Sequence, residues 1–531
     1  MNEPRAPAVW VSAAPPGEQV CTLTLLHHFL DATAERLPDK VALVCAGKRY
    51  RYAELKRSVD ALAATLCRGG VRRGDRVAIF LENGVEAVVS IYAAMRAGAV
   101  FMPINPLTKG EKLAYLLNDS RAAALVTHSL LREVWEPALA LNRRVQTCLV
   151  AGTDAAFPDA RCTPYCAALD TSAESLEEQL IDQDLAALIY TSGSTGEPKG
   201  VMLTHLNMVS AVRSVSTYLG LAESDVILCG LPLAFDYGLY QVLMAFAMGG
   251  TIVLERSFSF PVKILEAMAR ERVTVFPGVP TMFSLLMDIR TLSNYDLGSL
   301  RMITNTAAAL PEQHIHDLRV LFPQARLFSM YGLTECKRVS YLPPEQLDIR
   351  PTSVGRGMPN EELWLVDEAG NRLPNGSTGE LVIRGSHVMR GYWEKPEETA
   401  ARLRPGPFSG EKVLYSGDLF RTDEEGFLYF VARKDDIIKS RGEKVSPREV
   451  ENALYSLGGV REAAVVGVPD PVLGDAIKAF VVLRAGYHYS EREVIKHCLA
   501  RLENFMAPKY VAFVDALPKT DTGKIKKTGL G

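Results

Sequence analysis

The sequence predicts an α/β protein in which helices cover parallel sheets, followed by a small antiparallel β unit and an α+β C-terminal domain. Three observations support this fold class. Strand and helix signals alternate from the first helical segment to residue 304. From Glu362 onward, short strand signals are separated by Gly, Asp and Asn turns. A charged, non-repetitive link at 433–436 then precedes a segment with its own α+β pattern.

The alternation in the first part of the chain comes from apolar periodicity. Helical spacing predicts helices at 23–36, 85–96 and 113–118. Short apolar runs predict strands at 76–81, 99–104, 122–127, 186–190, 226–229, 251–254, 273–276 and 301–304. Helical stretches lie between most of these strands, as expected for units that build parallel sheets.

The later elements are shorter and differently connected. Strands of the antiparallel unit are predicted at 362–366, 379–383, 414–419 and 426–431. Beyond the charged link we predict helices at 447–456 and 490–501, and strands at 460–468 and 476–483. The change of pattern places a domain boundary near Asp435.

Size and composition exclude several classes of protein. At 531 residues the chain is too long for one core. A net charge of -3 gives no electrostatic reason to bind nucleic acid or an anionic membrane. No apolar run reaches transmembrane length, and residues 1–22 resemble a loose tail more than a signal peptide. The nine cysteines are scattered, with Cys162 and Cys166 as the nearest pair, and we expect reduced thiols in a cytoplasmic protein.

The segment at 190–200, YTSGSTGEPKG, is the most informative motif of the chain. It follows the predicted strand 186–190 and precedes a segment with helix signals from about Thr204. Its glycines let the backbone approach a ligand closely, while its hydroxyls and Lys199 suit a polyphosphate. It matches neither a Walker A loop nor a GxGxxG turn. A surface linker is the alternative, but linkers rarely lie between a buried strand and a helix.

Four further segments carry chemistry, each with an ordinary structural alternative. Residues 331–335 read YGLTE, which offers a carboxylate that can bind Mg²⁺ and a tyrosine that can pack on a purine ring. The structural alternative is the capped start of a helix. Residues 415–419 read YSGDL, with an aspartate at a strand end that either accepts ribose hydroxyls or forms a turn. Residues 430–451 combine basic and acidic residues at the domain link, and a solvated charged turn is the alternative there. Residues 517–527 read LPKTDTGKIKK, which is either a turn that positions a lysine or a frayed basic tail.

In this order and spacing, the five segments resemble the adenylate-forming superfamily: acyl- and aryl-CoA synthetases, peptide-synthetase adenylation domains and beetle luciferases. The resemblance extends from about Leu23 to Lys527. It implies a large N-terminal region of two β/α subdomains plus a small β-barrel-like subdomain, and a mobile α+β C-terminal domain. The corresponding boundaries are a tail at 1–22, an AMP-binding domain at 23–434 and a lid domain at 435–531.

The resemblance assigns nucleotide contacts to residues of these motifs. It implies that the phosphate loop comprises Thr191, Ser192, Gly193, Ser194, Thr195, Gly196 and Lys199. Tyr331 is expected near the adenine, Thr334 at a phosphate and Glu335 at Mg²⁺. Asp418 matches the residue that binds the ribose, and Arg433 one that contacts the ribose region.

The C-terminal motifs are assigned to the reacting groups. Lys524 matches the lysine that bridges the substrate carboxylate and the α-phosphate. Asp435 is at the position of the hinge about which the C-terminal domain swings between the two steps. Lys439 and Gly442 lie in the stretch that faces the thiol-bearing arm after that swing.

The acid-binding side departs from many fatty and aryl acid ligases, which carry histidine at the position of Phe235. The Phe235-Asp236 pair resembles peptide-synthetase domains, in which this aspartate binds the α-ammonium of an amino acid; a bond to backbone amides is the alternative. Tyr240, Asn305 and Arg338 complete the predicted substrate pocket. Lys337 and Arg338 are unusual so close to it, and they either hold an anionic group or point to solvent.

Two smaller departures are Ala432 and Thr306, where the family commonly has glycine. Neither removes a charge or a donor, so we expect activity.

The resemblance implies an ATP-dependent carboxylic acid–thiol ligase. The expected cofactors are ATP, Mg²⁺, and CoA or the phosphopantetheine of a separate carrier protein. The expected product of the first step is an acyl-AMP, formed when Mg²⁺, Lys524 and the loop neutralise the phosphates and align the carboxylate. A stand-alone enzyme that loads an amino acid such as proline on a peptidyl carrier is the alternative. A luciferase-like oxidoreductase is a further alternative, which no segment of the sequence favours. A non-catalytic binding module is disfavoured, because Lys199, Glu335, Asp418, Arg433 and Lys524 are all present.

Overall fold

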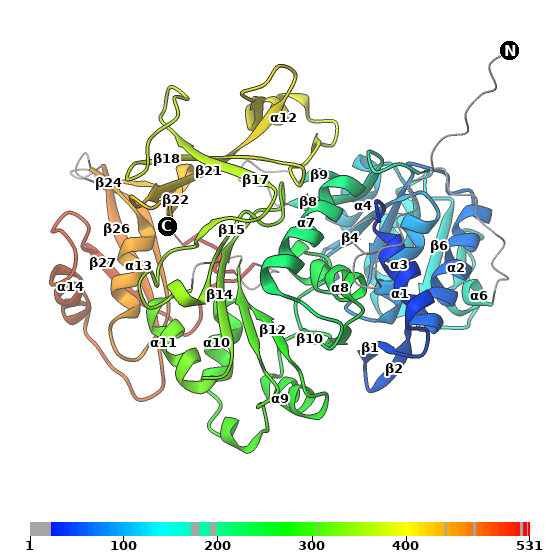
Figure 1. Cartoon of the computed structure of the whole chain (residues 1–531), viewed down its shortest axis with the longest axis horizontal. Coiled ribbons are helices and arrows are strands. Elements are labelled where there is room, and N and C mark those ends of the chain that lie inside the picture. The colour runs from blue at the N-terminus through cyan, green and yellow to red at the C-terminus, as the bar shows by residue number, and fades with distance from the viewer. Residues whose placement is uncertain are drawn as a thin grey trace, which may run out of the picture.

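The computed structural model describes residues 23–170, 180–191, 198–306, 308, 310–440, 443–470, 474–520, 524–527 and 529–530. Over these residues the chain forms an eight-stranded and a nine-stranded sheet, and two five-stranded sheets (Figure 1). The predicted tail at 1–22 lies outside the described residues. The predicted α/β class is confirmed.

The eight-stranded sheet has the order β19-β9-β8-β4-β3-β5-β6-β7, and neighbours from β8 to β7 are parallel. Its strands are β3 (Arg76–Phe80), β4 (Val100–Ile104), β5 (Ala122–His128), β6 (Thr147–Ala151), β7 (Cys162–Pro164), β8 (Leu185–Thr191), β9 (Lys199–Thr204) and β19 (Gly391–Tyr392). Its accompanying helices are α2 (Tyr52–Arg68), α3 (Val85–Arg96), α4 (Gly110–Asp119), η2 (Ser129–Leu131), α5 (Arg132–Ala140) and α6 (Tyr165–Leu169).

The nine-stranded sheet has the order β16-β15-β14-β13-β12-β10-β11-β1-β2, parallel from β14 to β1 and antiparallel at both edges. Its strands are β1 (Val41–Cys45), β2 (Lys48–Arg51), β10 (Val226–Cys229), β11 (Thr251–Leu254), β12 (Val275–Gly278), β13 (Met302–Asn305), β14 (Arg326–Tyr331), β15 (Ser340–Leu342) and β16 (Arg356–Gly357). Its helices are α1 (His27–Arg36), α7 (His205–Leu219), α8 (Asp236–Met248), α9 (Pro261–Arg270), α10 (Pro280–Met287), η3 (Leu292–Asn294), α11 (Glu312–Leu321) and η4 (Pro344–Gln346).

One apolar core joins the two large sheets. Helices α1, α2, α3, α7 and α8 contribute to it, and alternate residues of the strands, such as Val77 and Ile79 of β3, point toward it. Their neighbours Ala78 and Phe80 point to the opposite face, where α4 and α5 cover the sheet. Because successive strand residues face opposite sides, these short apolar runs bury both faces of the sheet.

The segment after the predicted phosphate loop begins as a strand. Residues 199–204 form β9, antiparallel to β8, where only helix signals from Thr204 were predicted. The helix follows directly: the Thr204 hydroxyl accepts from the Asn207 amide at 3.1 Å, and the Asn207 side chain accepts from the Thr204 amide at 2.9 Å. This capping pair confirms the predicted helix start. The loop therefore closes a hairpin, which makes the sheet mixed.

The antiparallel unit is a five-stranded sheet, β17-β18-β21-β20 with β22 paired to β21. Its elements are β17 (Glu361–Val366), β18 (Thr378–Gly385), α12 (Pro396–Arg402), β20 (Leu403–Pro405), β21 (Lys412–Thr422) and β22 (Leu428–Arg433). The link follows as η5 (Lys434–Asp436).

The C-terminal sheet has the order β24-β23-β26-β25, with β27 parallel to β26. Its elements are β23 (Ile438–Ser440), β24 (Glu443–Val445), α13 (Pro447–Tyr455), β25 (Val460–Asp470), β26 (Gly474–Leu483), α14 (Glu491–Leu499) and β27 (Tyr510–Phe513). Its core is separate from that of the large sheets, as expected for a second folding unit.

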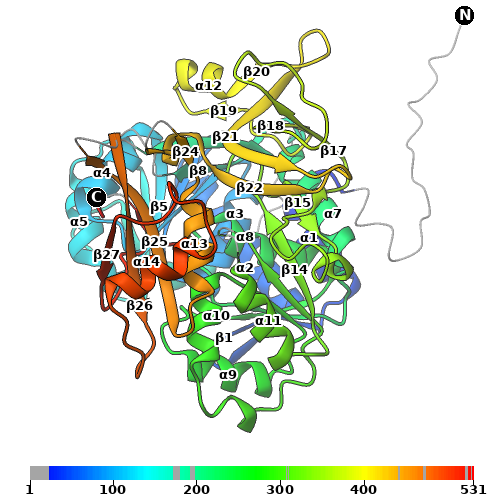
Figure 2. The ribbon, with the colours of Figure 1, turned by 90° about the vertical axis from the view of Figure 1, so that its left-hand side faces the viewer.

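The C-terminal sheet packs beside α10 and α11 (Figure 2). Arg461 and Arg484 lie 3.5 and 3.8 Å from the Asp288 carboxylate at the end of α10. His314 of α11 meets Tyr455 of α13 edge to face, with ring centroids 5.9 Å apart. These contacts fix the C-terminal sheet against the nine-stranded sheet.

Eight cysteines fall in the described part of the chain, and none of these eight is in a disulfide. No described helix combines the length and the apolar character that a membrane crossing requires.

Candidate active site

The ends of the predicted phosphate loop meet at the base of the β8–β9 hairpin. Thr191 and Lys199 are register partners, and the Thr191 hydroxyl donates to the Lys199 carbonyl at 3.5 Å. The Lys199 amine lies over the ring of Tyr392, 5.7 Å from its centroid. The loop residues between them, Ser192, Gly193, Ser194, Thr195 and Gly196, lie outside the described residues.

Glu335 is joined to this hairpin by a residue that sequence reasoning missed. The Tyr392 hydroxyl donates to Glu335 Oε1 at 2.7 Å, and Tyr392 belongs to β19, which pairs with β9. Burial raises the Tyr392 pKa, and the neighbouring Glu335 raises it further. The hydroxyl is therefore a stable donor that orients the carboxylate. Tyr392 is uncharged and lies outside the five sequence motifs, so only its place in the fold identifies it as the residue that orients Glu335. Thr334 is half-buried in the same turn as Glu335.

A bulge in β21 presents Asp418, the predicted ribose ligand. The register shifts opposite 416–418, and Gly417 has a φ of +74° there, with Arg402 too close for a Cβ atom. Asp418 lies within β21 and not at a strand end as predicted. Asp418 Oδ2 accepts from the Tyr331 hydroxyl at 2.6 Å, and Arg433 Nε lies 3.9 Å from Oδ1. The bulge therefore brings Asp418, Tyr331 and Arg433 together.

Burial raises the pKa of Asp418, and the bond from Tyr331 and the charge of Arg433 counteract it. A buried carboxylate in this state gains from further donors, such as a pair of vicinal hydroxyls. The Tyr331 ring packs edge to face on Phe420, with centroids 4.8 Å apart. Its hydroxyl thus fixes Asp418 while its ring is part of an aromatic cluster.

Lys524 reaches this cluster from the other end of the chain. Its turn is closed by two bonds to Thr520: the Thr520 amide donates to the Lys524 carbonyl at 2.7 Å, and the Lys524 amide donates to the Thr520 hydroxyl at 3.1 Å. Burial lowers the Lys524 pKa, whereas Asp236, Asp418 and Glu335 raise it. The amine is therefore within electrostatic range of carboxylates from three other segments, which the sequence could not show.

The predicted acid-binding residues gather around the start of α8. Phe235 is the residue before the helix, and Asp236 is the first helical residue. No hydrogen bond joins the Asp236 carboxylate to any residue in the described part of the chain, so the backbone-amide alternative has no support there. Tyr240, one turn further, is buried, as is Asn305, whose amide donates to the Ala308 carbonyl at 3.0 Å.

Lys337 and Arg338 do not point to solvent, which excludes one of the two interpretations of this pair. Their exposed fractions are 1% and 3%. The Arg338 guanidinium lies 4.6 Å from the centroid of the Tyr237 ring, and the Lys337 amine 5.4 Å from that of Tyr240. Lys337 was not among the predicted pocket residues, although its charge beside YGLTE was a usable signal.

The hinge and thiol-side predictions are only partly within the described structure. Asp435 lies in the short turn η5, and Lys439 in β23. Gly442 lies outside the described residues. Their proposed roles stay predictions.

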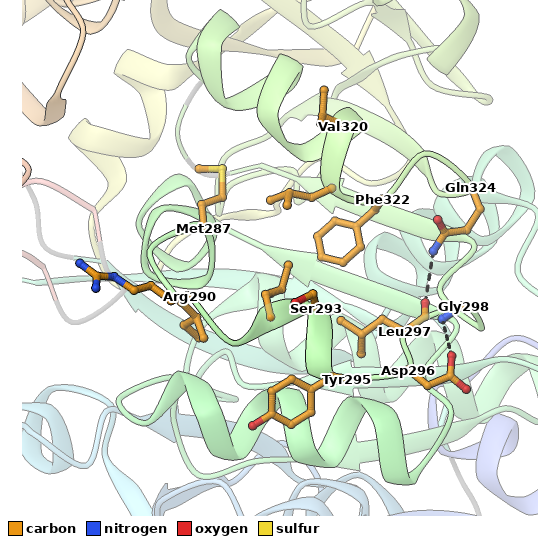
Figure 3. Close-up of a pocket in the computed structure, with 13 residues that line it drawn as sticks. Met287, Arg290, Ser293, Tyr295, Asp296, Leu297, Gly298, Val320, Phe322 and Gln324 are labelled. Atoms are coloured by element: carbon orange, nitrogen blue, oxygen red, sulfur yellow. Dashed lines mark hydrogen bonds between the residues drawn. The ribbon is translucent and has the colours of Figure 1, made fainter.

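A surface cavity of about 570 Å³ lies between α10 and the end of α11 (Figure 3). Met287, Leu297 and Phe322 line it, and no predicted site residue does so. It is separate from the cluster around Lys524.

Comparison with known proteins identifies relatives of the whole chain. Residues 30–393 match the family model described as AMP-binding enzyme, and residues 449–524 match that of the AMP-binding enzyme C-terminal domain. The chain is 36% identical over 501 residues to a feruloyl-CoA synthase of Amycolatopsis sp, covering 93% of this chain and 96% of the relative. It is 32% identical over 532 residues to a long-chain-fatty-acid–CoA ligase of Bacillus subtilis, covering 95% and 94%.

Among solved structures, the anthranilate CoA ligase AuaEII in complex with anthranoyl-AMP superposes with a TM-score of 0.87. The two chains are 26% identical, and the match covers 96% of this chain and 98% of that one.

Proposed function

Because this chain belongs to the AMP-binding enzyme family and is an ATP-dependent acid–CoA ligase that forms an acyl-AMP, we propose that Lys524, Glu335 and the β8–β9 loop perform the first step. The observation that carries this proposal is the position of Lys524, a residue of the C-terminal segment, within range of Glu335, Asp418 and Asp236. The three carboxylates come from separate segments of the chain, and all lie within electrostatic range of the Lys524 amine.

In the proposed first step, a carboxylate oxygen of the acid attacks the α-phosphorus of ATP, and pyrophosphate leaves. The charge of Lys524 offsets the repulsion between the carboxylate and the phosphates, and it stabilises the charge on the reacting oxygens. The loop ending at Thr191 and Lys199 would hold the β- and γ-phosphates. Asp418, fixed by Tyr331, would accept the ribose hydroxyls, and Arg433 would lie beside them.

In the second step, the thiol of CoA attacks the carbonyl carbon and AMP leaves. We propose that the C-terminal domain, residues 435–531, turns about Asp435 between the steps and places Lys439 and Gly442 beside the thiol arm. The phosphopantetheine of a carrier protein ends in the same arm, so a separate carrier is a second possible acceptor.

Glu335 fits a Mg²⁺ ligand. Tyr392 binds only one of its carboxylate oxygens, which leaves the other for a cation. No group of three described acidic, histidine or cysteine side chains is placed to hold a metal ion. Mg²⁺ at Glu335 would therefore take its other ligands from phosphate and water, as this ion commonly does. When bound, it would neutralise phosphate charge.

Two classes of carboxylic acid are candidates for the substrate. The relatives named above act on aromatic and fatty acids according to their names, so plain carboxylic acids come first. One observation favours an amino acid as the second candidate: the Asp236 carboxylate is half-buried without a hydrogen bond from a described residue.

The test is ATP–pyrophosphate exchange over a panel of fatty, aryl, dicarboxylic and amino acids, followed by thioester formation with CoA or a phosphopantetheinylated carrier. Exchange that needs both an acid and Mg²⁺, followed by CoA thioester formation, is the expected result. If none of the acids in the panel supported pyrophosphate exchange, the proposal would be contradicted.

A further inference from the structure

Two buried polar groups beside the proposed acid site have no hydrogen-bond partner among the residues that the structure describes. The Lys337 amine and the Tyr240 hydroxyl are both unpaired, although the exposed fractions of these residues are only 1% and 2%. The Lys337 amine lies over the Tyr240 ring, so the two groups belong to one cluster. Buried polar groups are nearly always paired, and an unpaired pair in an active site indicates the place of a ligand.

The contact with Tyr240 does not satisfy the lysine. A ring face attracts the charge, but an ammonium has three N–H donors that need acceptors. No ion pair joins Lys337 to a carboxylate in the described part of the chain, although Asp236 and Glu335 act on it from further away. Arg338, the next residue, repels it. The amine is therefore short of both an acceptor and a negative charge.

The backbone of Lys337 adds a second unfavourable feature. Its φ of +69° lies in the left-handed region that favours glycine or asparagine. The turn that begins at Gly332 is tight: a Cβ atom there would lie 2.2 Å from the Lys337 carbonyl. The amide of Lys337 donates to the Leu333 carbonyl at 2.7 Å and so closes this turn. Strain together with an unpaired buried charge is typical of a residue retained for function.

We infer that Lys337 and Tyr240 bind a second acidic group of the substrate, and that the acid activated by this enzyme is a dicarboxylic acid. This inference rests on the proposed function. One carboxylate would react beside Lys524, and the other would accept from the Lys337 amine and the Tyr240 hydroxyl. Tyr240 is one helical turn from Asp236, about 6 Å along α8, which suits a short diacid.

The same cluster disfavours an amino-acid substrate. Asp236 lies within electrostatic range of both Lys337 and Lys524, and it raises the pKa of each. A substrate ammonium at Asp236 would add a third positive charge to this region, and like charges in a buried site repel strongly. A second carboxylate on the substrate would supply the missing negative charge.

The test compares acids matched in length, such as butyrate with succinate and hexanoate with adipate, in the exchange assay with the full-length enzyme. We expect kcat/KM for the preferred diacid to exceed that of its monoacid by about 100-fold, since a site built to bind a polar group discriminates strongly against its absence. Lys337→Met should lower kcat/KM for the diacid far more than for the monoacid, and so remove this preference. Tyr240→Phe should reduce the preference in part.

The melting temperature distinguishes a binding role of Lys337 from a purely structural one. Lys337→Met replaces a buried charge with an apolar chain of similar length, so it should raise the melting temperature while it abolishes the diacid preference. Lys263→Met is the matched control, because Lys263 also lies over a ring, that of Phe260 at 5.3 Å, but on an exposed part of α9. It should change neither property.

Each other outcome contradicts the inference. A Lys337→Met variant that melts lower, or keeps the wild-type ratio of diacid to monoacid, would assign Lys337 a structural role. A wild-type enzyme that uses monoacids equally well, or only amino acids, would overturn the diacid but leave the ligase function intact. If no acid supported exchange, both the diacid inference and the proposed ligase function would be overturned.

Discussion

Lys524 carries the charge on which the proposed first step depends. We predict that Lys524→Ala lowers adenylate formation by about 10²–10³, because loss of one stabilising contact to the transition state has this effect. Thioester formation from supplied acyl-AMP should be much less affected, since the lysine acts on the first step. Pyrophosphate exchange and thioester formation measure the two half-reactions separately. An equal fall in both would show that the lysine has another role.

Asp236 is the residue that separates the candidate acids. If an amino acid were bound, Asp236→Ala would bury an unpaired ammonium at a cost of about 3–5 kcal/mol. We expect a much smaller effect, less than about tenfold in kcat/KM, because the proposed diacid needs no partner at this position. Wild type and variant are compared on succinate and proline. Activity on proline that disappears in Asp236→Ala would favour the amino-acid alternative.

The buried amine of Lys337 makes stability depend on pH. Its pKa is lowered from 10.5 to about 8, chiefly by burial; Arg338 also lowers it, whereas Asp236, Cys336 and Glu335 raise it. Between pH 8 and 10.5 the unfolded chain holds a proton that the folded chain has released, so the free energy of unfolding rises with pH. The rise attributable to Lys337 is about 3 kcal/mol.

Urea unfolding of wild type and Lys337→Met at pH 7.5 to 10 (roughly the range over which the lysine titrates) measures this contribution. Other titrating groups are common to both proteins, so the difference between them isolates Lys337. The variant should be more stable at the lower pH, and the two should converge as pH rises. A constant difference would mean that Lys337 keeps an ordinary pKa.

At the scale of elements, the short turn η5 at Lys434–Asp436 connects β22 of the antiparallel sheet to β23 of the C-terminal sheet. We predict that Asp435→Pro spares adenylation and impairs thioester formation. Proline fixes φ, and it would lock a link whose dihedral angles must change during the proposed swing. Asp436→Ala, in the same turn, is the control. Equal rates of Asp435→Pro and wild type in both half-reactions would place the hinge elsewhere.

The contacts that hold the C-terminal sheet in place are compatible with such a swing. Asp288 and its partners Arg461 and Arg484 each expose about a third of their side chains. Ion pairs with this exposure contribute little stability, typically about 0–1 kcal/mol. The interface is thus weaker than the cores on either side.

At the scale of the whole molecule, the apolar core that the two large sheets share with the antiparallel unit ends at Leu428, and the C-terminal cores begin at Ile438. We predict that residues 1–434 alone fold cooperatively and retain binding of ATP, because their cores need no residue beyond the link. Without Lys524 they should form adenylate no better than full-length Lys524→Ala. Thermal unfolding and nucleotide titration test this prediction. A truncated chain that does not fold would show that the two units are interdependent.

The sequence by itself determined the elements with strong local signals. Val85–Arg96, Val226–Cys229 and Thr251–Leu254 have the predicted bounds, because apolar periodicity and turn residues act over a few neighbouring positions. The motifs around Glu335 and Lys524 were also visible, because phosphate and carboxylate chemistry needs particular side chains at close spacing. Strand β9, the hairpin β1–β2 and the antiparallel edge formed by β15 and β16 were missed, since their pairing partners are set by the sheet and not by their own sequence.

Only the tertiary structure decided which of these residues meet. It brought Lys524 within electrostatic range of Asp236 and Glu335, gave Glu335 its bond from Tyr392, and placed Asp418 on a bulge opposite Arg433. It also turned Lys337 into the interior, where sequence reasoning left solvent as an alternative. The physical reason is that local periodicity specifies which face of an element is apolar. The contacts between elements far apart in the chain depend on how those faces pack.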